Sequence, residues 1–521
     1  MSEKSVGFLL GLFVFIVILT LPTFETFIES ATQFISANRS TINPMRLAGA
    51  MQAVLALTFL MIIWWVTETI PLPATALLPA VILPLFHITG ISSNTFGEFT
   101  PKNVFINYAN PVIFLFLGGF LIAAAMRKWK LDYRLTLWLL TRGSLANSTR
   151  LLLLAMMGVT AFLSMWVSNT ATAAMMLPLG IGVLTLAGHT PGESHYGKAL
   201  MLGIAWAASI GGVGTIIGTP PNGIALGILN TTFAADVSYH RITFLDWMKF
   251  GIPYVVFTLP LAWVILLTLF PPETSSLKGG KEKLLDEKKM LGRLSTGEKG
   301  TIVVFLFTVV LWITNPFWRD IFPLSFVQQL QWIDEYSIGL IGGVLLFIVP
   351  ANIKNGIFLL EWKDTKYVEW GTLILFGGGI ALSDAMFKTG LAQWIASSFI
   401  GLFGTPSTLI MMFAVVFLID FLTEVTSNTA VTSMIVPVVI SIAQASGQNP
   451  ITLSVAAAVA ASMAFMLPVA TPPNALVYST GYIKMRDMIK AGFILDITGW
   501  LMTIGILIVF GCWLFGVFSI S

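Results

Sequence analysis

The sequence predicts an all-α polytopic membrane protein built as an inverted repeat, and three observations support this fold class. Hydrophobic residues make up 56% of the 521 residues and charged residues only 10%, whereas soluble proteins carry about 25% charged residues. Apolar runs of membrane-spanning length recur along the chain, and three short motifs occur twice in the same order. The 45 Gly and 25 Pro also predict interrupted helices, which a bilayer tolerates only around a protein-lined cavity.

Eleven apolar runs are the candidate membrane crossings, because a helix needs about 20 apolar residues to span a bilayer. They are residues 7–22, 50–66, 72–86, 106–127, 199–229, 250–270, 301–314, 336–350, 368–387, 451–478 and 492–518. The first run follows Lys4 and lacks a small-residue cleavage site. We therefore expect an uncleaved first span and a cytoplasmic N-terminus.

Two further runs, residues 151–187 and 406–443, are too long for one crossing and carry Ser-Asn-Thr in the middle. We expect each to form a re-entrant hairpin. Eleven transmembrane helices with two such hairpins place 21 of the 28 Lys and Arg residues on the cytoplasmic side and 7 on the other. Cytoplasmic loops carry this excess, which supports the assignment, and we expect a multi-pass protein of the cell (plasma or inner) membrane.

Charge patterning marks two segments that do not span. Residues 271–300 interleave Lys and Glu with few apolar residues, which predicts a cytoplasmic linker. Residues 127–142 alternate basic and apolar positions, which predicts an amphipathic helix along the membrane surface. The chain then divides into a first span and loop (1–49), a first repeat with the first hairpin (50–270), the linker (271–300) and a second repeat with the second hairpin (301–521).

The internal repeat depends on three pairs of motifs. SNTATAAMMLP at 168–178 and SNTAVTSMIVP at 427–437 share six of eleven residues at an offset of 259. FLGG at 116–119 corresponds to FGGG at 376–379, and TPPN at 219–222 recurs at 471–474. Five predicted crossings separate the two hairpins, and an odd number places equivalent elements on opposite sides of the membrane. The repeats are therefore inverted, as in many alternating-access transporters.

The Ser-Asn-Thr motifs have the chemistry of anion sites. Each falls where its hairpin turns back, ahead of an Ala-rich helix, and such residues cap helix starts. A helix start carries about half a positive charge and free N–H groups. A plain helix cap or an interhelical hydrogen bond is the alternative, but duplication favours the anion site. The residues are Ser168, Asn169, Thr170, Ser427, Asn428 and Thr429.

The two Thr-Pro-Pro-Asn motifs have the chemistry of cation sites. Each puts two prolines inside an apolar run, and proline removes a helical hydrogen bond, so both spans should unwind and free backbone carbonyls. Unwound carbonyls beside polar side chains coordinate sodium in transporters. A structural kink is the alternative, and repetition of the whole tetrapeptide again favours the site.

The charge balance predicts cation coupling. No Lys, Arg or His lies within either hairpin core or either Pro-Pro break, so a doubly charged anion has no side-chain counter-ion there. Bound cations would supply the missing charge. Glu424 and Asp420 are the alternative, as proton carriers, and Asp384 and Glu68 are further intramembrane acids. Packing or an ion pair near the surface also explains each of them.

Other classes of protein lack support in this sequence. A net charge of +3, spread along loops, does not fit a nucleic-acid partner. The single cysteine, Cys512, excludes a disulfide framework, and four scattered histidines have no zinc-site spacing. No arrangement of nucleophile, base and orienting residue appears, so we expect no enzyme and no organic cofactor.

At these motifs the chain resembles the divalent anion/sodium symporter family, whose members move dicarboxylates, citrate or sulfate. The resemblance includes WWVTETIPLPATALLP at 64–79, both Ser-Asn-Thr hairpins, GTPPN at 218–222 and ATPPN at 470–474. It implies a homodimer in the lipid bilayer. It also implies that each protomer has a scaffold and a transport domain that moves like an elevator.

The resemblance also implies site residues. One sodium would lie among Ser164, Ser168, Asn169 and Gly218, and a second among Thr423, Thr426, Asn428 and Ala470. Substrate carboxylates would meet Asn169, Thr170, Thr219, Ser427, Asn428, Thr429 and Thr471.

We therefore expect a secondary active transporter of C4–C6 di- or tricarboxylates, such as succinate, malate, 2-oxoglutarate or citrate, coupled to Na⁺. A sodium-independent dicarboxylate exchanger of the same family is the first alternative. Some exchangers carry a basic residue where this chain has Thr172, which favours the symporter. An ion channel or a purely structural membrane protein is the second alternative, but neither explains two copies of a cation-and-anion site.

Overall fold

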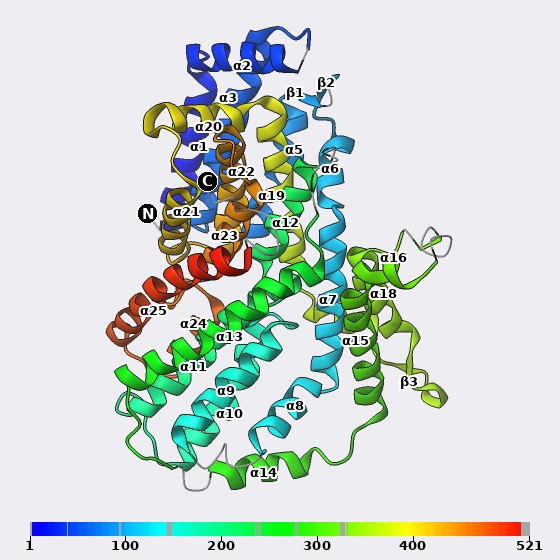
Figure 1. The fold of residues 1–521 in the computed structure, drawn as a ribbon, viewed down its shortest axis with the longest axis vertical. Helices are drawn as coiled ribbons and strands as arrows, with labels where there is room; N and C mark the ends of the chain where they lie inside the picture. Colours follow the sequence, from blue (N-terminus) through cyan, green and yellow to red (C-terminus); the bar gives the residue numbers. More distant parts are fainter. Residues whose placement is uncertain are drawn as a thin grey trace.

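The computed structural model describes residues 3–511, except 39, 93–94, 143–147, 235, 237–238, 240, 277–279, 324–328 and 331. Helices dominate this part of the chain (Figure 1). Its strands form two antiparallel ribbons, β1 (Thr89–Ser92) with β2 (Thr95–Glu98) and β3 (Pro350–Asn352) with β4 (Ile357–Phe358). The predicted all-α fold class is confirmed.

Several helices in the first part of the chain begin at a proline. Asn43, Thr100 and Asn110 cap the starts of α3, α6 and α7, and a proline follows each cap, where its missing N–H does no harm. These helices are α1 (Glu3–Thr20), α2 (Glu25–Ala37), α3 (Pro44–Val66), α4 (Leu72–Thr75), α5 (Leu78–Leu85), α6 (Pro101–Tyr108) and α7 (Pro111–Lys128).

The first hairpin and the first broken helix follow a short connecting helix. Two prolines open the helix after the break, at the position that the sequence predicts. The elements are α8 (Leu131–Leu140), α9 (Thr149–Ser164), α10 (Asn169–Leu186), α11 (His195–Gly212), the 3-10 turn η2 (Ile216–Gly218), α12 (Pro220–Thr232), α13 (Phe244–Leu269) and α14 (Gly280–Met290).

The second half repeats this order. Its elements are α15 (Thr296–Thr314), η3 (Asn315–Phe317), α16 (Trp318–Ile321), α18 (Glu335–Ile348), η4 (Ile353–Asn355), η5 (Trp362–Tyr367), α19 (Trp370–Thr389), α20 (Leu391–Phe403), α21 (Thr408–Thr423), α22 (Asn428–Ala445), α23 (Pro450–Ala460), α24 (Pro472–Tyr478), α25 (Met485–Ile506) and the π-helical turn η6 (Leu507–Gly511). The α21–α22 hairpin and the broken helix α23–α24 match α9–α10 and α11–α12 in order.

The repeated glycine pairs let helices approach closely. A Cβ built on Gly118 of α7 would lie 2.0 Å from the carbonyl oxygen of Gly339 on α18. A Cβ on Gly378 of α19, at the matched position, would lie 2.2 Å from the carbonyl oxygen of Ala76. Small residues at such crossings are typical of membrane helix packing. The FLGG and FGGG motifs are therefore packing motifs.

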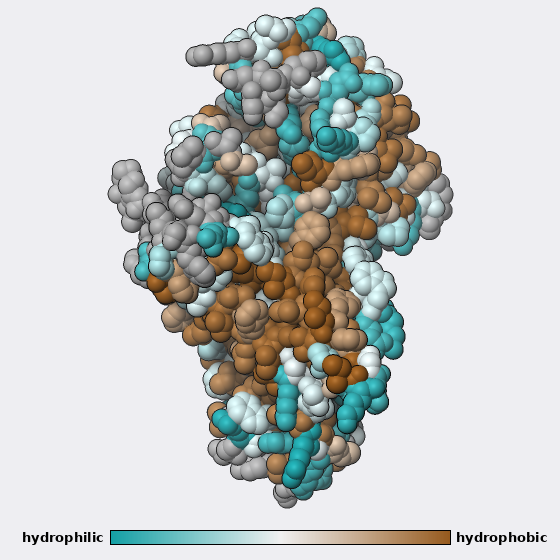
Figure 2. All heavy atoms as spheres, turned by 90° about the vertical axis from the view of Figure 1, so that its right-hand side faces the viewer, coloured by the Kyte–Doolittle hydropathy of each residue, from teal (hydrophilic) through white to brown (hydrophobic). Residues whose placement is uncertain are grey.

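Buried apolar side chains form two clusters. The larger joins α7–α13 with α15, α18 and α21–α25, the smaller joins α1–α3 with α5 and α20, and α19 contributes to both. Figure 2 shows an apolar band across the middle of the molecule between hydrophilic ends. Exposed apolar side chains of α15 and α18, such as Leu306, Phe307 and Ile348, fit a lipid-facing surface.

The described residues contain eight helices long and apolar enough to cross a membrane, or up to ten if two bent pairs each count as one span. Some predicted crossings are broken into shorter helices, such as α4 with α5. The predicted number of eleven transmembrane helices is not confirmed. The end of the last predicted run, residues 512–518, lies outside the described residues, as does Cys512.

Two predicted segments differ in detail from the structure. The expected amphipathic helix at 127–142 begins only at Leu131, because α7 continues to Lys128 and the left-handed φ of 53° at Lys130 interrupts the helix. The linker at 271–300 contains α14, which packs on α8 through a 3.0 Å hydrogen bond from the Tyr133 hydroxyl to Glu287. Figure 1 shows α8 and α14 together at the lower end of the molecule.

Candidate functional site

The turns of both hairpins line a single cavity of about 800 Å³. In Figure 1, α9–α10 approaches the centre from below and α21–α22 from above. The two Pro-Pro breaks line the same cavity beside the hairpin turns. All seven residues predicted to bind substrate line the cavity: Asn169, Thr170, Thr219, Ser427, Asn428, Thr429 and Thr471. The fold thus brings together residues that are up to 302 positions apart.

The same hydrogen bond closes both hairpin turns. The Ser164 hydroxyl donates to Oδ1 of Asn169 over 2.7 Å, and the Thr423 hydroxyl donates to Oδ1 of Asn428 over 2.6 Å. Each bond joins the last residue of one hairpin arm to the first residue of the other. The two asparagines are therefore fixed in matched orientations at the cavity wall.

Of the four helix starts at the cavity, one in each repeat is capped by a side chain and one is not. Ser168 caps α10 by accepting from the N–H of Ala171, and Thr471 caps α24 by accepting from the N–H of Asn474. Ser427 and Thr219 occupy the same positions on α22 and α12, but their side chains make no capping bond. The prediction that both Ser-Asn-Thr clusters cap their helices holds only for the first. The starts of α22 and α12 keep N–H donors for an anion.

An asparagine holds each Pro-Pro break. The side-chain amide of Asn222 donates to the carbonyls of Gly212 (3.2 Å) and Thr215 (2.8 Å). That of Asn474 donates to the carbonyls of Ala464 (2.9 Å) and Leu467 (3.0 Å). The predicted unwinding is present, but two of the carbonyls that it frees are taken by the asparagine of the motif. Sequence reasoning assigned no role to these asparagines, although they belong to the repeated motif.

The predicted sodium residues lie in two layers. Ser168, Asn169, Thr426, Asn428 and Ala470 line the cavity, whereas Ser164 and Thr423 are fully buried behind the hairpin turns. Gly218 is also buried, and a Cβ built there would lie 2.4 Å from the carbonyl oxygen of Gly212. Only glycine fits this close approach of one part of the break to another.

Oxygen atoms without partners remain beside both hairpin turns. The Thr426 hydroxyl is buried and has no hydrogen-bond partner among the described residues, and the same is true of Oδ1 of Asn222 and of Asn474. Buried polar atoms are normally paired, and hydroxyl, amide and carbonyl oxygens are ligands for hard cations. The donor set at the two breaks therefore fits sodium.

The four acids singled out in the sequence have different surroundings. Asp384 forms a 2.8 Å ion pair with Lys388, so its charge is compensated locally. Glu424 accepts from the backbone N–H groups of Phe465, Met466 and Leu467, which fixes the second break. Both oxygens of Asp420 are buried without a partner among the described residues. Glu68 lines the cavity.

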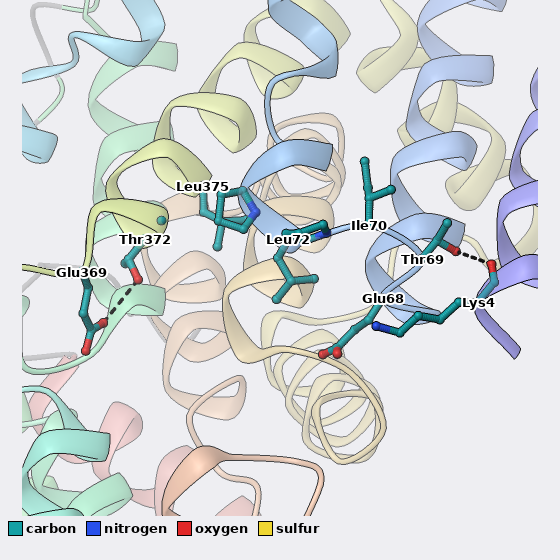
Figure 3. A pocket seen from close by; sticks show the side chains of 11 residues that line it. Lys4, Glu68, Thr69, Ile70, Leu72, Glu369, Thr372 and Leu375 are labelled. Atoms are coloured by element: carbon teal, nitrogen blue, oxygen red, sulfur yellow. Dashed lines mark hydrogen bonds between the residues drawn. The ribbon is translucent and has the colours of Figure 1, made fainter. Parts of the chain in front are cut away.

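The cavity also has charged lining residues that sequence reasoning did not bring to the site. Lys4 of α1 and Glu369, just before α19, line it together with Glu68. No motif or local spacing relates these three positions, so the sequence carries no signal that could have joined them. A smaller adjoining cavity of about 460 Å³ is lined by the same three side chains (Figure 3).

Comparison with known proteins identifies relatives over most of the chain. Residues 41–517 match the sodium:sulfate symporter transmembrane region. The chain is 38% identical over 449 residues to the sodium-dependent dicarboxylate transporter SdcS of Staphylococcus saprophyticus subsp. saprophyticus, covering 84% of this chain and 82% of that one. It is 38% identical over 450 residues to SdcS of Staphylococcus aureus, with the same coverage.

Two solved structures are similar in fold. The YdaH transporter of Alcanivorax borkumensis gives a TM-score of 0.54 at 15% identity, covering 87% of this chain and 98% of that one. The antimetabolite efflux pump MtrF of Neisseria gonorrhoeae gives 0.54 at 13% identity, covering 90% and 98%. This likeness supports the membrane-transporter fold alone. The sequence matches identify the family: the chain belongs to the sodium:sulfate symporter family, which is the divalent anion/sodium symporter family that its motifs resemble.

Proposed function

We propose that this chain is a secondary active transporter that moves a small dicarboxylate together with Na⁺. One observation carries the proposal: two matched hairpin turns and two matched Pro-Pro breaks line a single cavity on its uncharged side. The name of the SdcS relatives, sodium-dependent dicarboxylate transporter, supports the same assignment. The C4 acids succinate and malate, and the longer 2-oxoglutarate and citrate, are the candidate substrates.

Charge balance explains why sodium and substrate would bind together. A dianion in an uncharged site within a membrane is costly, as is an isolated cation. In the proposed site, Asn169 and Asn428 serve both ligands, because each belongs to a sodium set and to the substrate set. Each ligand then lowers the free energy of binding the other, which is reciprocal coupling. The uncapped starts of α12 and α22 would hold the two carboxylates.

We further propose elevator-type movement. The hairpins and broken helices, α9–α13 and α21–α25, would carry the bound ligands past a scaffold made of α1–α7, α15, α18 and α19. Inverted repeats that meet at one site are the architecture of alternating-access transporters. The cavity lies between these two groups of helices, since Trp65, Leu72 and Leu375 of the scaffold complete its lining.

Transport by purified protein in liposomes tests the function. Symport predicts that an inward sodium gradient drives accumulation of labelled succinate into vesicles with no internal substrate, and that potassium does not replace sodium. Uptake that requires internal dicarboxylate and ignores sodium would instead identify an exchanger. No uptake of any di- or tricarboxylate under either condition would reject transport of this class.

A further inference from the structure

The charges that line the cavity are confined to one wall. The hairpin turns and Pro-Pro breaks, here called the neutral wall, carry no charged residue among the lining residues. The charged wall consists of Lys4, Glu68 and Glu369, with a formal charge of −1. Among the described residues that line either cavity, these three are the only charged ones. An anion held at the neutral wall therefore faces net negative charge.

The charged wall continues from the larger cavity into the smaller one. Six residues line both cavities: Lys4, Glu68, Leu72, Glu369, Thr372 and Leu375. Figure 3 shows Lys4 and Glu68 extending toward each other, with Glu369 on the far side of Leu72 and Leu375. The three charges thus stand on separate elements around one continuous space.

A built turn holds Glu68 at this wall. Its φ of 44° lies in the left-handed region, which is strained for a non-glycine residue and tends to occur at functional positions. The hydroxyls of Thr67 and Thr69 are 2.7 Å apart across the turn, and the Thr69 hydroxyl donates to the Lys4 carbonyl over 3.4 Å. The turn therefore fixes Glu68 and also anchors the first turn of α1.

Close packing of α1 on this turn restrains Lys4. A Cβ built on Gly7 would lie 2.3 Å from the Thr67 hydroxyl oxygen, so the start of α1 touches the turn directly. Neither Lys4, Glu68 nor Glu369 forms an ion pair with another described residue. Glu369 accepts a 3.3 Å hydrogen bond from Thr372, which orients its side chain but leaves its charge. Lys4 and Glu68 face each other, so what remains beside the cavities is the net charge of −1 of the three residues.

We propose that Lys4, Glu68 and Glu369 form a charge filter that favours cargo with two carboxylates over cargo with three. The inference rests on the proposed function, since it assumes that two carboxylates of the substrate meet the neutral wall. A third carboxylate then points toward the charged wall. There it meets two like charges and one opposite charge, so a trianion is disfavoured relative to a dianion of similar shape.

The size of the effect follows from partly screened Coulomb repulsion. Glu369 is half-buried, whereas Lys4 and Glu68 are exposed, so solvent and salt weaken each interaction. We expect each glutamate to weaken binding of a trianion about threefold relative to a dianion, and the pair together to weaken it about tenfold. Removal of the Lys4 charge should weaken binding of a trianion further relative to a dianion.

The test compares citrate with succinate at mildly alkaline pH, where all three carboxyl groups of citrate are ionised. Titration calorimetry in sodium buffer gives both dissociation constants for purified protein, independently of transport. We expect Glu68→Gln with Glu369→Gln to improve citrate binding relative to succinate about tenfold, and Lys4→Gln to worsen it about threefold. The control Glu98→Gln removes an exposed acid outside both cavities, which is paired with Arg46, and should leave the ratio unchanged.

The ratio of citrate to succinate affinity is expected to change in opposite directions in the two kinds of variant. Misfolding would instead weaken the binding of both ligands together. An unchanged ratio in the double variant would overturn the filter, and so would an equal change in Glu98→Gln, because the effect would then come from overall charge. Lowering the pH until citrate loses one charge should abolish the difference between wild type and double variant. Loss of the sodium requirement would overturn the proposed symport but leave these ratios intact.

Discussion

At the scale of single residues, we expect transport to depend on the two hairpin asparagines. Asn169 and Asn428 accept matched hydrogen bonds from Ser164 and Thr423 and line the same cavity. We expect Asn169→Ala and Asn428→Ala each to abolish sodium-driven succinate uptake, a loss of at least 100-fold if the residue serves both ion and substrate, roughly two tenfold steps of 1.4 kcal/mol. The fold should survive at lower stability, because each change removes a side chain at the cavity wall and with it the acceptor of the bond that closes the hairpin turn.

Asn103→Ala is the matched control, because Asn103 is exposed and does not line the cavity. Uptake by the control should equal that of the wild type. Size-exclusion profiles and thermal unfolding of all three variants report whether the fold is kept. Normal uptake by either hairpin variant would remove that asparagine from the site.

A second residue-scale prediction concerns Asp496 of α25. It is buried beside the carboxyl group of Glu424 and the N–H of Phe465, but that N–H donates to Glu424, and neither oxygen of Asp496 has a hydrogen bond of normal geometry among the described residues. An unpaired buried polar group destabilises a fold by about 1–3 kcal/mol. Asp496→Asn keeps the shape and gains an amide donor for Glu424, so it should raise thermal stability and leave uptake within about twofold.

Asp384→Asn is the control, and it should change thermal stability in the opposite direction. Asp384 pairs with Lys388 at 2.8 Å, so its replacement leaves the lysine without its partner and should lower stability. Differential scanning fluorimetry of both variants gives the comparison. Loss of sodium-driven uptake in Asp496→Asn, with the fold intact, would instead show that the buried acids carry a coupling charge.

The sequence was sufficient for the residues of the neutral wall and insufficient for those of the charged wall. Asn169, Thr219, Asn428 and Thr471 belong to motifs that occur twice, and the duplication distinguished them from ordinary polar residues in a membrane. Lys4 and Glu369 are 365 positions apart, and only the packing of α1 and α19 around the cavity brings them together. Single charged residues outside motifs give no such signal.

At the scale of elements, the Pro-Pro breaks are stabilised by their asparagines. Asn222 and Asn474 each donate to two carbonyls of the preceding unwound segment. Removal of the amide leaves the buried carbonyl of Gly212 or of Ala464 unpaired, which destabilises by about 1–3 kcal/mol, whereas the carbonyls of Thr215 and Leu467 keep a backbone N–H partner. We expect Asn222→Ala and Asn474→Ala both to lower the unfolding temperature and to weaken stabilisation of the protein by added sodium chloride.

Asn355→Ala, at an exposed position in η4, should change neither quantity. Thermal unfolding in sodium and in potassium chloride separates the two effects, since only binding of sodium produces a difference between the salts. Full sodium stabilisation in both break variants would show that the breaks do not shape a sodium site.

Helices, breaks and hairpins could be predicted from the sequence where a single local feature determines them. Proline placed the two breaks, and the excess length of two apolar runs with polar centres placed the two hairpins. Helix capping could not be predicted in this way, because Ser168 and Ser427 have the same local sequence but only Ser168 makes the capping bond. That difference depends on tertiary packing. The start of α8 also differs from the prediction, because the left-handed backbone conformation of Lys130 interrupts the helix before Leu131.

At the scale of the whole molecule, movement between the two proposed groups of helices must break contacts between them. One such contact joins α12 to α18, where the Asn230 amide donates to the Tyr336 hydroxyl over 2.7 Å. Arg241 lies over the Tyr336 ring at 4.3 Å and pairs with Glu335 at 3.0 Å. This cluster holds the end of α12 against α18, and so joins the two proposed groups of helices.

A cross-link at this contact should arrest transport. In a Cys512→Ser background, we expect Asn230→Cys with Tyr336→Cys to lose uptake after treatment with a short bifunctional thiol reagent, and reduction of a cleavable reagent should restore it. Lys198→Cys with Asp487→Cys is the matched control, because the 2.8 Å ion pair of these residues joins α11 and α25, which belong to the same proposed moving group. The control should transport normally when cross-linked. Uptake that continues after complete cross-linking of α12 to α18 would mean that these helices do not separate during transport, which an elevator movement of the proposed groups requires.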